Sequence, residues 1–146
     1  MMKPAVVFTL AVMALGSSLF AKDGWSEDFK GGLAKAKAEK KRVLVDFTGS
    51  DWCGWCVKLD REVFSQPEFK EYAAKNLVLV EVDFPQTKAQ SKEQQAKNKA
   101  LAEKYSIRGY PTVLIFNAAG KEIGKLGYMP GGPQAFIEAL EKLPKP

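Results

Sequence analysis

The sequence predicts an α/β fold in which a central mixed β-sheet is flanked by helices on both faces. Helix-like and strand-like segments alternate along the chain, so that a strand–helix–strand half precedes a hairpin and a closing helix. The strand-like runs are short and apolar. With 146 residues, 46% of them apolar, the chain is long enough for one domain with a single hydrophobic core.

The first predicted helix is capped by Ser26 and presents apolar side chains at helical spacing, namely Trp25, Phe29, Leu33 and Ala36. The cations near its end are expected to form a solvated face: Lys35, Lys37, Lys40, Lys41 and Arg42. The run 43–47 is rich in β-branched residues and predicts a buried strand.

A helix is expected to open near Trp52 and Cys53 and to run to about Phe64, with Ser50 or Asp51 as its cap. Pro67 begins a second helical stretch that ends near residue 75. Residues 77–83 form the next predicted strand, because this run is again apolar and β-branched.

A polar segment then leads into a helix that includes Leu101 and Tyr105. Residues 112–116 are apolar throughout and predict a central strand, and residues 121–128 supply its hairpin partner. The last helix turns four apolar side chains inward: Phe136, Ile137, Leu140 and Leu143. We expect the long segment 84–104 to be a lengthened helix; a partner-binding insertion is the alternative.

Residues 1–21 have the layout of a secretory signal peptide, which would leave residues 22–146 as the mature domain. Lys3 precedes an apolar run of eleven residues, and small residues lead to an expected cleavage site after Ala21. The alternative is an uncleaved membrane anchor. Export to the periplasm or the cell exterior would place the protein where disulfides persist.

The chain contains two cysteines and no histidine, which narrows its chemistry. Histidine-based catalysis and Cys2His2 zinc sites are excluded, so no metal site is expected within one chain. The net charge of +5 is mild, and acidic residues are interspersed with the lysines. No clustered basic footprint indicates a nucleic-acid partner.

Both cysteines lie in the segment Trp52-Cys53-Gly54-Trp55-Cys56, where a predicted strand passes into a helix. The backbone N–H groups and the dipole at a helix start favour the thiolate, so Cys53 is the expected nucleophile. Cys56 lies one turn further in and would resolve a mixed disulfide on Cys53. A c-type haem is excluded because Val57 follows the second cysteine; a zinc site shared between two chains remains an alternative.

Three separated elements together resemble the thioredoxin superfamily, in its secreted thioredoxin-like branch. These are the strand 43–47, the redox motif 52–56, and the loop Ile107-Arg108-Gly109-Tyr110-Pro111-Thr112 about sixty residues later. The likeness covers residues 43–140 and implies the thioredoxin fold. The resemblance also implies that Pro111 is a cis proline opposite the sulfurs, which would let the Tyr110 backbone pair with an extended substrate. An ordinary trans proline is the alternative.

By the same resemblance Asp46 is the buried carboxylate that accepts the proton of Cys56 through water. It stands seven residues before Cys53, one more than is usual in the family, so a partly exposed aspartate without a catalytic role is the alternative. Trp52 and Trp55 are expected to form an apolar docking surface for substrates, although packing is an equal prospect for Trp52.

The predicted protein is therefore an exported thiol–disulfide oxidoreductase that exchanges disulfides with protein substrates. The catalytic residues would be Cys53, Cys56 and Asp46, and no cofactor is expected besides the redox-active disulfide Cys53–Cys56. Because no imidazolium stands near Cys53, we expect a reductase or isomerase rather than a strong oxidase. The resemblance implies a membrane thiol carrier as electron donor, and we expect a monomer. The alternative is a non-catalytic thioredoxin-fold binding module.

Overall fold

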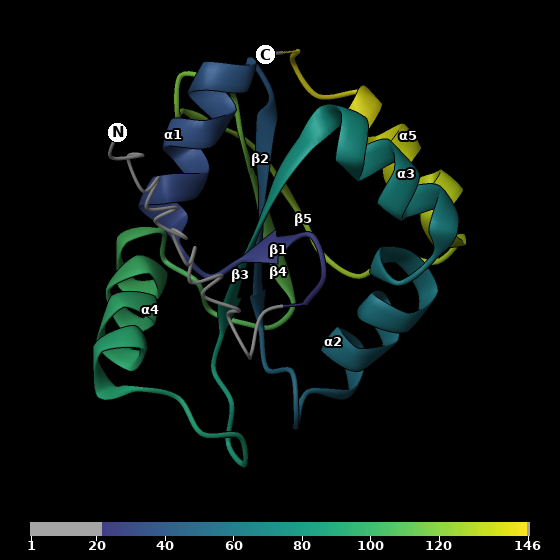
Figure 1. Ribbon diagram of the computed structural model, residues 1–146. Coiled ribbons are helices and arrows are strands. Elements are labelled where there is room, and N and C mark those ends of the chain that lie inside the picture. Colours follow the sequence, from purple (N-terminus) through teal and green to yellow (C-terminus); the bar gives the residue numbers. More distant parts are fainter. Residues whose placement is uncertain (1–21, 146) are drawn as a thin grey trace, which may run out of the picture.

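The computed structural model describes residues 22–145 and contains one five-stranded sheet in the order β1-β3-β2-β4-β5. The predicted signal peptide, residues 1–21, lies outside the described residues. Helices cover both faces of the sheet, with α1 and α4 on one side and α2, α3 and α5 on the other (Figure 1). The predicted α/β class and the order of its elements are confirmed.

The elements follow the predicted sequence of helices and strands, with two short additions. The strands are β1 (Trp25–Ser26), β2 (Arg42–Thr48), β3 (Leu77–Asp83), β4 (Thr112–Phe116) and β5 (Glu122–Leu126). The helices are α1 (Phe29–Glu39), α2 (Gly54–Leu59), η1 (Asp60–Phe64), α3 (Pro67–Asn76), α4 (Lys92–Lys104) and α5 (Gly132–Glu141). The additions are β1 and the π-helical turn η1.

Strand β2 is the middle of the sheet. It pairs in parallel with β3 over all seven residues and antiparallel with β4 over five. Every residue of β2 is buried, because partner strands cover both its edges and helices cover both its faces. Since Thr48 lies opposite Asp83, the carboxyl ends of β2 and β3 reach the same edge of the sheet.

Two hydrophobic clusters lie on the two faces of the sheet. The cluster under α2, η1, α3 and α5 contains Leu44, Leu59, Val63, Phe64, Phe69, Ile115, Phe136 and Leu140. The cluster under α1 and α4 contains Phe29, Ala36, Val43, Val45, Phe47, Val80, Leu114 and Phe116. Alternate residues of β2 therefore serve opposite clusters, as the period of a strand requires.

The first helix starts later than the sequence predicts. Trp25 and Ser26 form the short strand β1, which pairs in parallel with β3, and α1 begins at Phe29. Its N-cap is Asp28, which accepts a hydrogen bond from the N–H of Gly31 at 3.0 Å. The expected cap at Ser26 is wrong, because the edge of β3 takes this backbone into the sheet.

The helix after β2 also starts later than predicted. It begins at Gly54, and the N-cap is Cys53 itself, so the expected cap at Ser50 or Asp51 is wrong. The helical path continues to Phe64 as predicted, but its second half, η1, is a π-helical turn. Such turns occur mostly inside helices near functional sites.

One of the cations expected on a solvated face is buried. The Arg42 side chain donates through Nη1 to the Leu140 carbonyl oxygen at 2.6 Å and through Nη2 to the Tyr72 hydroxyl at 3.1 Å. It therefore ties β2 to the carboxyl-terminal end of α5, where a cation is favoured by the helix dipole.

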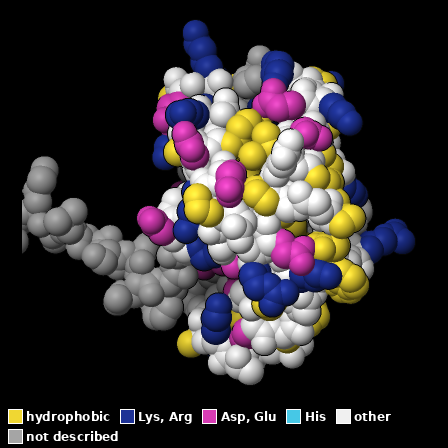
Figure 2. Space-filling view, turned by 90° about the vertical axis from the view of Figure 1, so that its right-hand side faces the viewer, with side chains coloured by type: hydrophobic (Ala, Val, Ile, Leu, Met, Phe, Trp, Pro, Cys, Tyr) yellow, Lys and Arg dark blue, Asp and Glu magenta, His cyan; other side chains and the backbone are white. Residues whose placement is uncertain are grey.

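The outer face of α3 and α5 carries mixed charge. Figure 2 shows Lys and Arg side chains interspersed with Asp and Glu over this side of the molecule, so that neither sign of charge dominates it.

In the part of the chain that the structure describes, no helix is long and apolar enough to cross a membrane.

Helix α1 lies close against the sheet at Gly32. A Cβ atom at this position would stand 2.6 Å from Cγ2 of Val80, so we expect Gly32→Ala to overpack the helix–sheet contact. The expected loss is about 1–2 kcal/mol in the free energy of unfolding, although alanine favours helices by about 1 kcal/mol. Urea denaturation measures it. Gly54→Ala is the matched control and should not destabilise the fold, because the added methyl meets nothing within 4 Å apart from its chain neighbours and its own helix backbone.

Candidate active site

Cys53 and Cys56 lie where the loop after β2 enters α2, at the edge of the sheet formed by the ends of β2 and β3. They form a disulfide, with their Cα atoms 5.2 Å apart. Both side chains are largely buried, with exposed fractions of 7% for Cys53 and 4% for Cys56. Cys53 is the slightly more exposed of the two.

Backbone N–H groups point at both sulfurs. The N–H of Cys56 donates to Sγ of Cys53 at 3.2 Å, because Cys53 is the N-cap of α2. The N–H of Gly49 donates to Sγ of Cys56 at 3.5 Å. Such donors favour a thiolate over a thiol, so each sulfur has a fixed dipole ready when the disulfide is reduced.

The loop before β4 faces the cysteines. The peptide bond between Tyr110 and Pro111 is cis, and the carbonyl oxygen of Tyr110 lies 3.7 Å from Sγ of Cys53. The half-buried Tyr110 ring packs against Phe84 and Trp52, at centroid distances of 5.3 and 5.8 Å. The structure therefore brings Tyr110, 57 residues from Cys53 in the sequence, and with it the cis peptide bond to Pro111, beside the redox pair.

The two tryptophans flank the cysteines in different ways. Trp52 is 43% exposed, yet its Nε1 donates to the Phe84 carbonyl oxygen at 2.7 Å, so the ring is both anchored and open to contact. A Cβ atom on Gly49 would stand 2.4 Å from this ring, which explains the glycine. Trp55 is 55% exposed and packs on Tyr128 at 5.0 Å.

The start of the segment 84–104 is bound to the active-site loop. The Asp51 carboxylate accepts hydrogen bonds from the N–H groups of Gln86, Thr87 and Lys88 at 2.7–2.9 Å. The bond from the N–H of Gln86, followed by one from the Thr87 hydroxyl, is the main reason that the pKa of Asp51 lies far below its ordinary value. Residues 92–104 form α4, so the segment contains a regular helix preceded by a loop fastened beside Trp52.

Asp46 is buried in β2, with an exposed fraction of 3%. It shares the face of Leu44, toward α2, and its Oδ1 has no hydrogen-bond partner. Burial is the main cause that raises the pKa of Asp46 to about 7; Lys22 opposes this rise, while Glu81, Asp60 and Asp83 add to it. The alternative of a partly exposed aspartate is therefore wrong.

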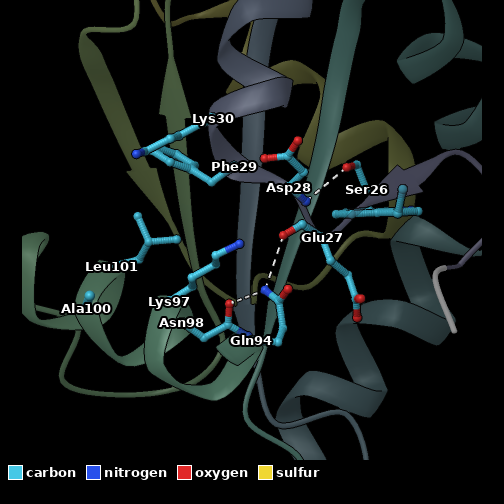
Figure 3. A pocket seen from close by; sticks show the side chains of 11 residues that line it. Ser26, Glu27, Asp28, Phe29, Lys30, Gln94, Lys97, Asn98, Ala100 and Leu101 are labelled. Atoms are coloured by element: carbon cyan, nitrogen blue, oxygen red, sulfur yellow. Dashed lines mark hydrogen bonds between the residues drawn. The ribbon is translucent and has the colours of Figure 1, made fainter. Parts of the chain in front are cut away.

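A cavity of about 690 Å³ lies away from the cysteines, between the start of α1 and α4 (Figure 3). Some of its polar groups bond to one another: Nε2 of Gln94 donates to Oδ1 of Asn98, and the N–H of Asp28 donates to the Ser26 hydroxyl oxygen. Within residues 22–145, no cluster of His, Cys, Asp or Glu side chains could hold a metal ion.

The predicted site residues come together at one edge of the sheet, except that Asp46 lies inside it. Three contributors were missed: Gly49, which donates to Cys56, Phe84, which supports Trp52, and Tyr128, which supports Trp55. No local sequence pattern identifies these residues, because their contacts with the site form between loops that come together only when the chain folds.

A disulfide of the CxxC type at a helix start, opposite a cis proline on this sheet, defines a thiol–disulfide oxidoreductase of the thioredoxin fold. The chain belongs to the family of thioredoxin-like domains, whose family model matches residues 29–144.

Two relatives from Chlamydia pneumoniae support this assignment. The disulfide bond reductase DsbH is 37% identical over 115 residues, which cover 79% of this chain and 69% of DsbH. The thioredoxin-related protein DsbJ is 33% identical over 103 residues, which cover 70% of this chain but only 30% of DsbJ.

A solved structure of a DsbH oxidoreductase superposes with a TM-score of 0.74 at 34% identity. The superposition covers 86% of this chain and 92% of that structure. The similarity therefore spans the whole domain and is not confined to the redox motif.

The raised pKa of Asp46 predicts how stability depends on pH. Between about pH 4 and 7 the unfolded carboxyl loses its proton while the folded one keeps it, so stability falls as the pH rises through this range. We expect Asp46→Asn to remove this fall. From pH 4 to pH 8, the free energy of unfolding of Asp46→Asn should therefore rise by on the order of 2–4 kcal/mol relative to that of the parent. Urea denaturation of the oxidised proteins measures the difference.

Asp51→Asn is the control for this prediction, because Asp51 is exposed and its pKa is shifted in the opposite direction. It should not reproduce the gain at high pH. Parallel pH profiles for Asp46→Asn and the parent would show that Asp46 is not the group responsible.

Proposed function

We propose that this protein is an exported thiol–disulfide oxidoreductase that reduces or isomerises disulfides in protein substrates. The observation that carries the proposal is the pairing of the Cys53–Cys56 disulfide with the backbone of Tyr110, 3.7 Å from Sγ of Cys53. The name of the relative DsbH, a disulfide bond reductase, supports the direction.

In the first step, the thiolate of Cys53 attacks a substrate disulfide. A bond forms between Sγ of Cys53 and one substrate sulfur, and the other substrate sulfur leaves as a thiolate that takes up a proton. Cys53 is suited to this step because it caps α2 and accepts from the N–H of Cys56, which favours the charged sulfur.

In the second step, Cys56 resolves the mixed disulfide. The Cys56 thiol gives its proton to the Asp46 carboxylate through water, and the resulting thiolate attacks Sγ of Cys53. The substrate leaves as a second thiol, and the protein is left as the Cys53–Cys56 disulfide. A buried carboxyl with a pKa near 7 and an unpartnered oxygen suits a group that takes and returns a proton near neutral pH.

The substrate would bind as an extended segment across the site. The backbone of Tyr110, next to the cis proline Pro111, can pair with such a segment as a sheet edge would. Trp52 and Trp55 offer exposed aromatic surface on either side of Cys53. Backbone pairing and aromatic contact are tolerant of sequence, which fits an enzyme that serves several proteins.

The neighbourhood of Cys53 supports a reductase or isomerase over a strong oxidase. A strong oxidant needs its reduced thiolate to be especially stable, and an imidazolium beside the sulfur is one source of that stability. Here the position before Cys56 is Trp55, and the stabilising groups are neutral N–H dipoles.

Export and electron supply belong to the same proposal. The layout of residues 1–21 supports export to the periplasm or the cell exterior with cleavage near Ala21. The mature protein is proposed to act as a monomer. A reductase in an oxidising compartment must itself be reduced, so a membrane thiol carrier is the proposed donor. On the face shown in Figure 2, positive and negative side chains are interspersed, so this face gives no support to a nucleic-acid partner.

Trapping tests the assigned cysteine roles. In Cys56→Ser the resolving thiol is absent, so mixed disulfides should accumulate on Cys53 and appear as bands that disappear on reduction. If no such species accumulate with insulin or with periplasmic proteins, the roles are wrong.

Cys53→Ser is the matched variant, and it should lower insulin reduction to the uncatalysed background. The same loss would reject the alternative of a non-catalytic binding module. Activity that survives in Cys53→Ser would reject the proposed nucleophile.

Histidine at position 55 should make the protein more oxidising. In Trp55→His an imidazolium would stand beside Cys53 and stabilise the reduced form, so the equilibrium with glutathione should shift by roughly tenfold, or 30 mV, toward reduced protein. Trp55→Phe keeps an aromatic ring without charge and should shift much less. An equal shift in both variants would show that packing on Tyr128, not charge, sets the potential.

A further inference from the structure

Two buried carboxyl groups lie with two partly exposed charged groups near the active-site helix, and the four come from separate parts of the chain. Lys22 precedes β1, Asp46 belongs to β2, Glu81 belongs to β3, and Asp60 begins η1 directly after the active-site helix. Asp46 and Glu81 are register partners on neighbouring strands, so two buried carboxyl groups stand side by side. Such a pair is tolerated when a counter-charge lies beside it or when one of the two carboxyl groups is protonated.

Lys22 supplies that counter-charge. Its Nζ lies 2.8 Å from Oε2 of Glu81 and 3.0 Å from Oδ1 of Asp60. The ammonium also lies 4.6 Å from the ring centroid of Trp25, which holds the lysine stem against β1. Burial alone would lower the pKa of Lys22, but Glu81 and the aspartates raise it, so the ammonium stays charged.

More negative than positive groups act on Asp46. Three are carboxyl groups, Glu81 and Asp83 on β3 and Asp60 in η1, and one is the ammonium of Lys22 before β1. The residue of β4 that pairs with Asp46 is the apolar Val113. Among the groups of residues 22–145 that shift the pKa of Asp46, Lys22 is the only cation. Without it, burial and three carboxyl groups would all act to keep Asp46 protonated.

We propose that Lys22 is a positioning residue for the redox reaction: its ammonium, held by Glu81 and Asp60, favours the ionised form of Asp46, which accepts the Cys56 proton. The inference rests on the proposed function, because it assigns to Lys22 the control of the second step. Lys22 touches neither sulfur nor substrate and acts only through the buried carboxyl group.

The test follows the second step across pH. Reduced protein is mixed with oxidised glutathione in a single turnover, at concentrations where the rate no longer depends on glutathione, so that attack by Cys56 limits the rate. In the parent the rate should rise with a midpoint near pH 7, where Asp46 ionises. In Lys22→Met, which keeps the length of the side chain, the midpoint should rise by at least about one pH unit.

The corresponding loss of rate at pH 7 is about fivefold, because the ionised fraction of Asp46 falls from about one half to about one tenth. At pH 9 the rates of Lys22→Met and the parent should converge. Lys22→Arg keeps the charge and should keep the midpoint. Lys75→Met, an exposed lysine beside Glu71, controls for the loss of one positive charge and should also leave it unchanged.

Glu81→Gln separates an electrostatic role from a structural one. It removes a carboxylate that favours protonation of Asp46, while Lys22 keeps its contact with Asp60, so the midpoint should fall. If the two substitutions acted only by loosening the fold, they would shift the pH midpoint of the rate in the same direction. Shifts of the same sign, or an unshifted midpoint in Lys22→Met, would overturn the inference.

Asp46→Asn distinguishes this failure from failure of the proposed function. If Asp46→Asn abolishes the pH dependence but Lys22→Met does not shift it, only the role of Lys22 is wrong. If the pH dependence survives in Asp46→Asn, the proposed role of Asp46 is wrong, and that of Lys22 with it.

Discussion

The parallel pairing of β2 with β3 is the interaction on which the rest of the structure depends. Seven residues of β2 lie in register with seven of β3, so both strands end at one edge of the sheet. The loops that leave this edge are then fastened to each other: Asp83 accepts from the N–H and hydroxyl of Ser50, and the Phe84 N–H donates to the Thr48 carbonyl oxygen. The entry to α2, and with it Cys53, is placed by these bonds.

The same pairing carries an electrostatic cost. Because Asp46 and Glu81 are register partners on strands that are covered by helices, two carboxyl groups are buried together. A hydrophobic pair would stabilise this sheet better, since buried charges cost free energy even when they are paired. The proposed role of Asp46 as a proton acceptor gives a reason for burying it. The ammonium of Lys22, bound to Glu81, offsets part of the repulsion between the two carboxyl groups.

The hydrogen-bond donors that point at the two sulfurs are neutral backbone groups. The N–H of Cys56 at the helix start donates to Sγ of Cys53, and that of Gly49 donates to Sγ of Cys56. Aromatic side chains, including the packed pair Trp52 and Tyr110, flank the cysteines. This environment is preorganised, because each ring has its own anchor: Trp52 bonds to the Phe84 carbonyl oxygen and Trp55 packs on Tyr128. Relationship to DsbH and the geometry of the site thus lead to the same class of reaction by independent routes.

The sequence by itself determined the fold class, the order of the predicted elements and the redox pair, because periodic burial and the motif around Cys53 are local signals. It also predicted which distant loop faces the cysteines, through the resemblance carried by Tyr110 and Pro111. Only the tertiary structure decided that Cys53 caps its own helix, that Asp46 is fully buried, and that Lys22 lies against Glu81 and Asp60. The physical reason is that burial, register and charge pairing arise between segments far apart in the chain, and no local pattern of residues encodes their distances.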